Sequence, residues 1–128
     1  MKVLLSIKPE FAELIFDGTK TYEFRKTVFK NPDIKTVVVY ATSPVKKIVG
    51  EFEIKEVVKD SPEDLWTSTK HSAGISKDFF DEYFSGRTQA CALAIASAKR
   101  YDTPIEPSSI FDNFVAPQSF RYIEANIN

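Results

Sequence analysis

The segment GTKTYEFRK, residues 18–26, places one acidic and three basic side chains around a tyrosine and a phenylalanine. It follows PEFAELIFDG, residues 9–18, which has the apolar spacing of a helix, a proline in the first turn and a glycine at the end. Within the segment, KTYEFRK alternates as a strand does, so its two aromatic rings point to one side and Glu23 and Arg25 to the other. The sequence therefore predicts a helix followed by a strand with one apolar and one charged face.

The rest of the chain predicts more strands than helices. Further strands are predicted at residues 2–7, 36–42, 47–58, 89–101 and 119–125, and two further helices begin at Ser61 and Ser76 and end near Lys70 and Gly86. Strands in succession with helices inserted between them indicate an α+β fold, a small mixed β-barrel of about six strands with about three helices. The 128 residues, 43% of them hydrophobic, fit one domain over residues 1–128.

Two positions in these elements carry specific expectations. Gly50 interrupts an alternating strand and predicts a bend or a bulge. The helix that begins at Ser76 carries an aromatic stripe, and its helical spacing predicts core packing rather than a ligand site. The stripe consists of Phe79, Phe80, Tyr83 and Phe84.

Composition excludes several classes of site. The single cysteine, Cys91, lies in the apolar run ACALAIA and is predicted to be buried, and with one histidine, His71, no His/Cys zinc cluster can form. We therefore predict no metal site and no cofactor, although carboxylates could still bind Mg²⁺. The opening MKVLLSIKPEF is interrupted by Lys8 and Pro9 too early for a leader or a membrane span, so a cytoplasmic location without a membrane partner is expected.

Charge is divided unevenly along the chain. The net charge is −1, which argues against a general coat for nucleic acid. Residues 1–47 nevertheless hold nine Lys or Arg against five Asp or Glu, and residues 48–128 hold eight against thirteen. The basic half contains the segment 18–26; an ordinary solvated surface is the alternative interpretation.

Four stretches in order are LSIKPEFAELIFDGTKTYEFRK, VVVYATSPVKKIVGEFEI, AGISKDFFDEYFSG and APQSFRYI, and together they resemble the ASCH domain family, a branch of the PUA-like superfamily. The family pattern G-x-K-x-x-E-x-R is matched by Gly18, Lys20, Glu23 and Arg25. The resemblance covers nearly the whole chain. It implies a PUA-like barrel with a cleft beside the first helix and the motif strand, and an RNA or nucleotide ligand.

The residue types at these positions suit such a ligand. A guanidinium such as that of Arg25 binds phosphate through two donors or stacks on a base. Lys20 is predicted to contact the ligand, and Lys8, at a predicted helix start, could join it around an anion. Glu23 could accept hydrogen bonds from a base edge or could pair with Arg25 and orient it.

Three further residues are weaker candidates. Ser43, at the broken end of a central strand, and Ser119, near the end of the chain together with Arg121, match family-like segments and could close the cleft. His71 is predicted to lie on an exposed helix end rather than to act as a base.

The sequence leaves open whether the protein is an enzyme. One ASCH branch hydrolyses the acetyl amide of N4-acetylcytidine with a lysine, a threonine three residues later and a distant glutamate, and other members have been proposed as ribonucleases. Lys20 matches the lysine, but Glu23 occupies the threonine position and HSAGIS, residues 71–76, contains no acid. We also expect Glu23 to favour the charged form of Lys20, which makes Lys20 an anchor rather than a base.

RNA or nucleotide binding, in RNA metabolism or transcription regulation, is therefore the preferred function. A hydrolase acting on a modified nucleoside or on RNA, with Lys20 stabilising an oxyanion and Glu23 as the base, is the first alternative. A protein-interaction adaptor that uses the acidic later half is the second.

Overall fold

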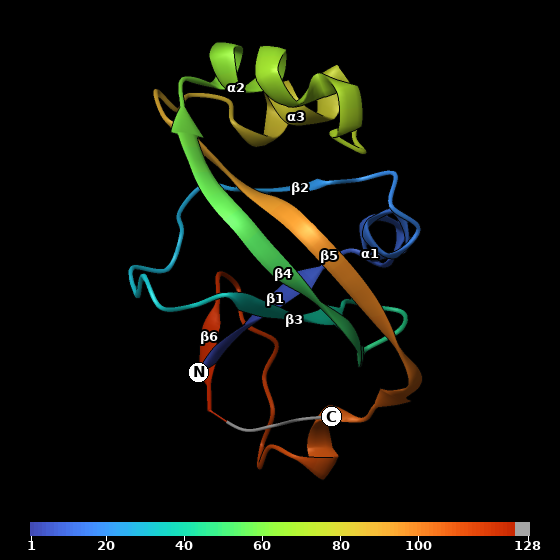
Figure 1. The fold of residues 1–128 in the computed structure, drawn as a ribbon. Coiled ribbons are helices and arrows are strands. Elements are labelled where there is room, and N and C mark those ends of the chain that lie inside the picture. The colour runs from blue at the N-terminus through green and yellow to red at the C-terminus, as the bar shows by residue number, and fades with distance from the viewer. Residues whose placement is uncertain (125–128) are drawn as a thin grey trace.

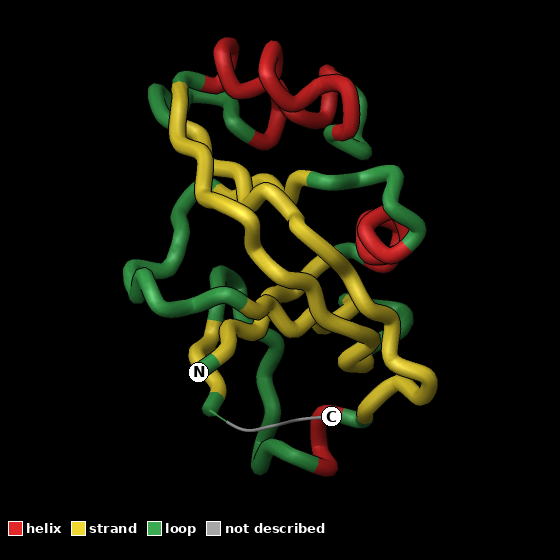
Figure 2. Tube along the Cα trace, viewed as in Figure 1, coloured by secondary structure: helices red, strands yellow, loops and turns green. Residues whose placement is uncertain are grey.

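The computed structural model describes residues 1–124, which form one mixed sheet, three α-helices and two short 3₁₀ turns (Figures 1 and 2). The elements in chain order are β1 (Lys2–Ile7), α1 (Pro9–Phe16), β2 (Tyr22–Arg25), β3 (Thr36–Ala41), β4 (Lys47–Asp60), α2 (Pro62–Thr69), η1 (Lys70–Ser72), α3 (Lys77–Tyr83), β5 (Ala90–Ile105), η2 (Pro107–Ser109) and β6 (Arg121–Ile123). The sheet has the order β2-β5-β4-β3-β1-β6. Strands β1 and β3 are parallel, and the other neighbouring pairs are antiparallel.

The predicted fold class is confirmed, with six strands and three α-helices in the expected order. Within the described residues the edge strands β2 and β6 do not pair with each other, so the sheet stays open rather than closing as a barrel. The alanine-rich segment predicted at 89–101 is a strand and continues to Ile105. The end of the last predicted strand, at residue 125, lies outside the described residues.

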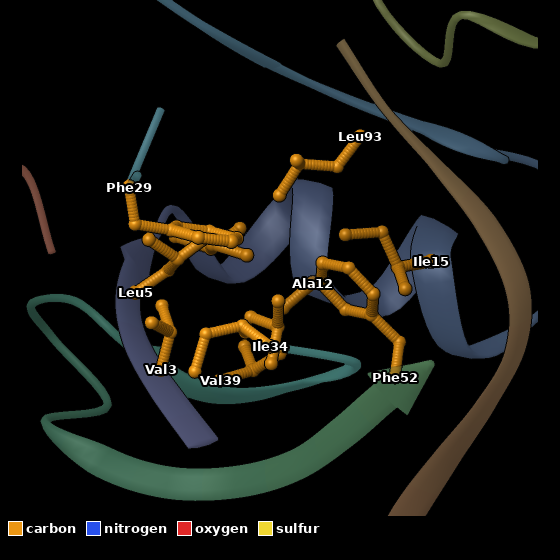
Figure 3. Close-up of a cluster of buried hydrophobic side chains, with 11 residues drawn as sticks. Val3, Leu5, Ala12, Ile15, Phe29, Ile34, Val39, Phe52 and Leu93 are labelled. Carbon is orange, nitrogen blue, oxygen red and sulfur yellow. The ribbon is translucent and has the colours of Figure 1, made fainter. Parts of the chain in front are cut away.

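Both faces of the central strands are buried, which explains their continuous apolar sequence. One face of β1 and β3 packs beneath α1, with Val3, Leu5 and Val39 against Ala12 and Ile15 (Figure 3). The opposite face packs against the segment that follows η2 through a second cluster of Leu4, Val38, Tyr40, Ile48, Tyr101 and Ile123. At the far end of β4 and β5, helices α2 and α3 cover a third cluster (Figure 1).

Gly50 lets the Phe16 ring of α1 lie directly against the long strand β4. A Cβ atom at this position would lie 2.5 Å from the Phe16 ring and 2.5 Å from the Lys99 carbonyl oxygen, so no side chain fits. In the pairing with β3, Val39 lies opposite Gly50 and Tyr40 opposite Ile48, so β4 has one extra residue beside Gly50, as the predicted bulge requires. The pair β4 and β5 contributes to the packing beneath α1 at one end and to the α2–α3 layer at the other.

The two later helices begin as their sequences predict. The Ser61 hydroxyl accepts a hydrogen bond from the Asp64 amide at 3.2 Å, and the Ser76 hydroxyl accepts one from the Phe79 amide at 3.1 Å. Cys91 is 4% exposed on β5, as predicted, and burial raises the pKa of its thiol. No helix among residues 1–124 combines the length and the apolar character needed to cross a membrane.

Candidate functional site

A cleft of about 280 Å³ opens where the end of β1, α1, β2 and α3 meet. This first cleft is lined by side chains from all four elements and from the residues between them: Ser6, Ile7, Lys8, Phe11, Lys20, Glu23, Phe24, Arg25, Ile75, Phe79 and Tyr83. It therefore brings together four of the six predicted ligand-binding residues, namely Lys8, Lys20, Glu23 and Arg25.

The turn after α1 directs Lys20 into the protein. Gly18 has a φ of +89°, a conformation that glycine adopts without the penalty of a Cβ atom. The Lys20 amide then donates to the Leu14 carbonyl at 3.0 Å, which fixes the start of the next segment against the helix. As a result Lys20 is only 2% exposed.

The buried ammonium group of Lys20 has specific partners. Nζ donates to the Ala73 carbonyl oxygen at 2.6 Å and lies 5.4 Å from the centre of the Phe11 ring and 4.8 Å from that of Phe24. Gly74 covers the aliphatic part of this side chain, because a Cβ atom on Gly74 would lie 2.5 Å from the Lys20 Cβ. Backbone and aromatic rings together hold the lysine in one position.

Burial lowers the pKa of Lys20 to about 8, and the nearby Glu23 carboxylate opposes that shift only in part. Glu23 favours the charged form of Lys20, as expected, but removal of water from the ammonium group has the larger, opposite effect. Lys20 therefore changes its protonation state near pH 8.

Glu23 and Arg25 form an ion pair beside Lys20. Arg25 Nη1 lies 3.3 Å from Glu23 Oε2, and Glu23 is 6% exposed. Burial raises the pKa of the Glu23 carboxyl, while Lys20 and Arg25 act in the opposite direction. The arrangement is a buried carboxyl group between two basic groups, one of which lies at the opening of the cleft.

Arg25 joins three segments that are distant in sequence. Its Nη2 donates to the Ser119 carbonyl oxygen at 2.8 Å and its Nη1 donates to the Ser6 carbonyl oxygen at 3.4 Å. Arg25 is part of the cleft lining as well, so it both joins these segments and borders the cleft.

Lys8 comes from the start of α1. It occupies the N-cap position without a side-chain capping bond, and its Nζ lies 5.1 Å from the centre of the Phe79 ring. Pro9 and Glu10 follow in the first turn, so the Glu10 carboxylate already provides a negative charge at this helix end.

Sequence reasoning missed the aromatic wall of the cleft. Phe80 and Phe84 are buried in the core as predicted, but Phe79 and Tyr83 of the same stripe line the cleft. Phe11 of α1 stands edge-on to Phe79 with ring centres 5.2 Å apart. Phe79 and Tyr83 are four residues apart, as are the core residues Phe80 and Phe84, and the two pairs are offset by one position. This offset is the signal that could have identified a second aromatic face on the helix.

The other candidates lie outside the lining. Ser43 is exposed in the turn after β3, and Ser119 contributes its carbonyl oxygen to Arg25 rather than its hydroxyl group. Arg121 packs over the Phe111 ring at 4.3 Å, away from the cleft. His71 is exposed, as predicted, and stands edge-on to Tyr22. In the part of the chain that the structure describes, no three His, Cys, Asp or Glu side chains are grouped to hold a metal ion.

Comparison with known proteins gives a family and a set of relatives. The model of the ASCH domain matches residues 5–103. An ASCH domain-containing ribonuclease of Zymomonas mobilis is 30% identical over 128 residues, covering 95% of this chain and 84% of that protein. The crystal structure of ASCH from Zymomonas mobilis superposes with a TM-score of 0.89 at 30% identity, covering 96% of this chain and 87% of that one.

A second kind of relative is much longer than this chain. The large ribosomal subunit protein uL22 of Ureaplasma parvum serovar 3 is 32% identical over 123 residues, covering 95% of this chain. The chain spans only 39% of the length of that protein.

Proposed function

Since the chain belongs to the ASCH domain family, we propose that it binds single-stranded RNA or a nucleotide in the first cleft. The observation that carries this proposal is the meeting of a cationic and an aromatic wall in one cleft. Lys8, Lys20 and Arg25 supply positive charge, and Phe11, Phe79 and Tyr83 supply flat apolar surface. Aromatic rings that stack a base and cations that contact phosphate are the usual elements of single-strand recognition.

Each wall takes a different part of the ligand in this proposal. The cleft volume of about 280 Å³ suits one base and its sugar better than a duplex. The base lies against Phe79 and Tyr83, and Glu23 bonds to its polar edge, as acidic side chains do with amino groups of bases. Arg25 and Lys8, nearer to solvent than Lys20, take the phosphate.

Binding is tested by fluorescence anisotropy of a dye-labelled single-stranded RNA at several salt concentrations. We expect Phe79→Leu to weaken binding about tenfold, because stacking contributes roughly 1–3 kcal/mol per base. We expect Arg25→Gln to reduce the slope of log affinity against log salt by about 0.7, the value for one phosphate contact on a single strand.

A matched control and a second readout make the test specific. Arg100→Gln removes the same charge from a residue that pairs with Glu13 outside the cleft, and should leave affinity unchanged. Backbone chemical shifts of labelled protein should move around the first cleft during titration with nucleosides. Wild-type affinity in both Phe79→Leu and Arg25→Gln would sink the proposal, and absence of any ligand would favour a protein-interaction adaptor.

Hydrolysis of RNA or of a modified nucleoside is a second candidate, favoured by one observation. Lys20 has a pKa of about 8 next to the buried carboxyl group of Glu23, so a proton donor and an acceptor share one site. The Zymomonas mobilis relative is named a ribonuclease. In this scheme Glu23 accepts a proton from the attacking group, and Lys20 stabilises the charge that develops on the substrate.

The variant Glu23→Gln distinguishes hydrolysis from binding alone. RNA and N4-acetylcytidine are incubated with wild-type protein and with Glu23→Gln, and products are followed by electrophoresis and by the acetyl signal in NMR. Turnover that is lost in Glu23→Gln while affinity persists would support hydrolysis. Turnover that persists in the variant would remove Glu23 as the base.

A further inference from the structure

A second groove, of about 240 Å³, lies between the β2–β3 connection and the later part of β4. In Figure 1 this connection leaves the end of β2 and passes beside β4 before it enters β3. Four lysines share the rim of the groove, which we call the lysine groove: Lys30, Lys35, Lys55 and Lys59. None of the charged residues proposed for the first cleft lines it.

The alternation of β4 sets the lysines on one face. Val58 packs with the cluster beneath α2 and α3, so Val57 and Lys59 on either side of it face the groove. Lys55 lies at an irregularity in the β4–β5 pairing, between Ile54 and Glu56, and lines the same groove. Lys55 and Lys59 are four residues apart on the strand, or about 13 Å, too far to contact one phosphate. The spacing suits successive charges of a chain rather than a single anion.

The lysines are available to a ligand. All four are exposed, and among residues 1–124 none of them forms an ion pair with an acidic side chain. Glu56 is the acidic residue that lines the groove. The exposed Asp33 and Asp60 are adjacent in sequence to residues of the lining. In a protein of net charge −1, this is a local excess of positive charge.

The floor of the groove is apolar and partly open to solvent. Val28, Phe29, Ile34 and Ile54 line it, and Val57 is 40% exposed. Lysines around an apolar floor can hold phosphates while the sugars and bases lie on the aliphatic surface. An apolar floor of this kind has no role in a site for a free inorganic anion.

The lysine groove is close in sequence to the first cleft. Arg25 lines the first cleft and Val28 lines the lysine groove, so only two residues, Lys26 and Thr27, separate the two linings in sequence. The exposed Lys26 lies in this step, with its Nζ 4.9 Å from the centre of the Tyr83 ring, and Arg87 donates to its carbonyl oxygen at 3.0 Å. Basic side chains therefore continue from one cavity toward the other.

We infer that the lysine groove holds the phosphate backbone of a single-stranded RNA that places one nucleotide in the first cleft. The inference rests on the proposed function and deepens it: the ligand is an RNA chain of several nucleotides, not a free nucleoside. Continuity with the first cleft favours RNA over an acidic peptide, because the aromatic wall at one end can stack a base.

The test compares two double variants with equal loss of charge. Lys55→Gln/Lys59→Gln changes the groove, and Lys70→Gln/Lys99→Gln changes two exposed lysines that line neither cavity. Affinity for a dye-labelled oligouridylate of about 12 nucleotides is measured against salt, and uridine monophosphate is titrated by NMR. Thermal unfolding of each variant confirms that it is folded.

We expect the groove variant to reduce the salt slope by about 1.4, twice the value for one single-strand contact, and the control variant to leave it unchanged. Binding of uridine monophosphate should not change in either. Equal slopes in the two double variants would overturn the inference while leaving the first cleft intact. Equal binding of polyglutamate and the oligouridylate would also overturn it, in favour of an acidic protein partner.

The same measurements distinguish this inference from the proposed function. If Arg25→Gln and Phe79→Leu have no effect while the groove variant loses affinity, the lysine groove binds RNA but the first cleft does not. Such a result would refute the path between the two cavities. Binding of uridine monophosphate without binding of RNA would overturn this inference alone, and absence of both would overturn the proposed function as well.

Discussion

Replacing Lys20 by methionine should change how stability depends on pH. The wild-type ammonium group is buried with a pKa of about 8, against 10.5 for the ordinary side chain. Between these values the unfolded chain binds a proton that the folded protein has released, so the stability of the wild type rises with pH. Below pH 8 both states are protonated, and the folded protein carries the full cost of the buried charge. The methionine side chain does not titrate, so this contribution to the pH dependence is absent from Lys20→Met.

The size of the effect follows from the two pKa values. The cost of the buried charge is about 3 kcal/mol near pH 8 and falls below about 1 kcal/mol near pH 10, since one pKa unit corresponds to about 1.4 kcal/mol. The wild type should therefore gain about 2 kcal/mol relative to Lys20→Met over this interval. Other titrating groups are common to both proteins and largely cancel in the difference.

Urea unfolding of both proteins at several pH values between about 8 and about 10 measures this difference directly. Lys70→Met is the control, because Lys70 is exposed and its substitution should give a difference that does not depend on pH. A difference between wild type and Lys20→Met that stays constant across the interval would refute the reasoning, since it would mean that burial does not lower the pKa of Lys20.

Three further predictions concern stability, each measured by urea or thermal unfolding. Gly74→Ala should destabilise the protein more than Gly86→Ala. Both glycines have positive φ, +69° and +78°, and an alanine in that conformation costs about 1–2 kcal/mol at either position. Only at Gly74 would the new methyl group also collide with the buried Lys20 side chain. Equal losses would show that the lysine moves aside freely. Phe80→Ala should cost about 3–5 kcal/mol, because the ring is fully buried beneath α2 and α3; a loss below about 1 kcal/mol would contradict that packing. Arg100→Ala should cost less than about 1 kcal/mol despite its bidentate bond to Glu13, because both side chains are largely exposed, and a larger loss would contradict the weak value assigned to the pair.

Local patterns were sufficient for most of the elements. Alternation and β-branched residues predicted the strands, and side-chain caps with a proline at the first turn predicted the helix that begins after Ser61, because these signals act over a few neighbouring residues. Even the alanine-rich β5 was assigned from the alternation of Cys91, Leu93 and Ile95. The openness of the sheet was not predictable in this way, since it depends on whether two strands far apart in sequence meet.

The candidate site was predicted only in part, for the same reason. The motif at residues 18–26 supplied Lys20, Glu23 and Arg25, which the structure brings into one cleft. The aromatic wall was assigned to the core, because helical spacing identifies an apolar face but cannot say whether another element covers all of it. Phe79 lies on the part of that face that α1 leaves beside the cleft.

The sequence by itself determined the order of the elements, the fold class and the basic motif of this protein, because each is encoded in short-range spacing and residue type. Only the tertiary structure decided the state of the charges in the motif. A lysine and a glutamate at exposed positions would keep their ordinary pKa values. Here Gly74, Phe11 and Phe24 exclude water from Lys20, and burial moves the pKa values of both groups toward neutrality, which is what makes the site a candidate for chemistry as well as for binding.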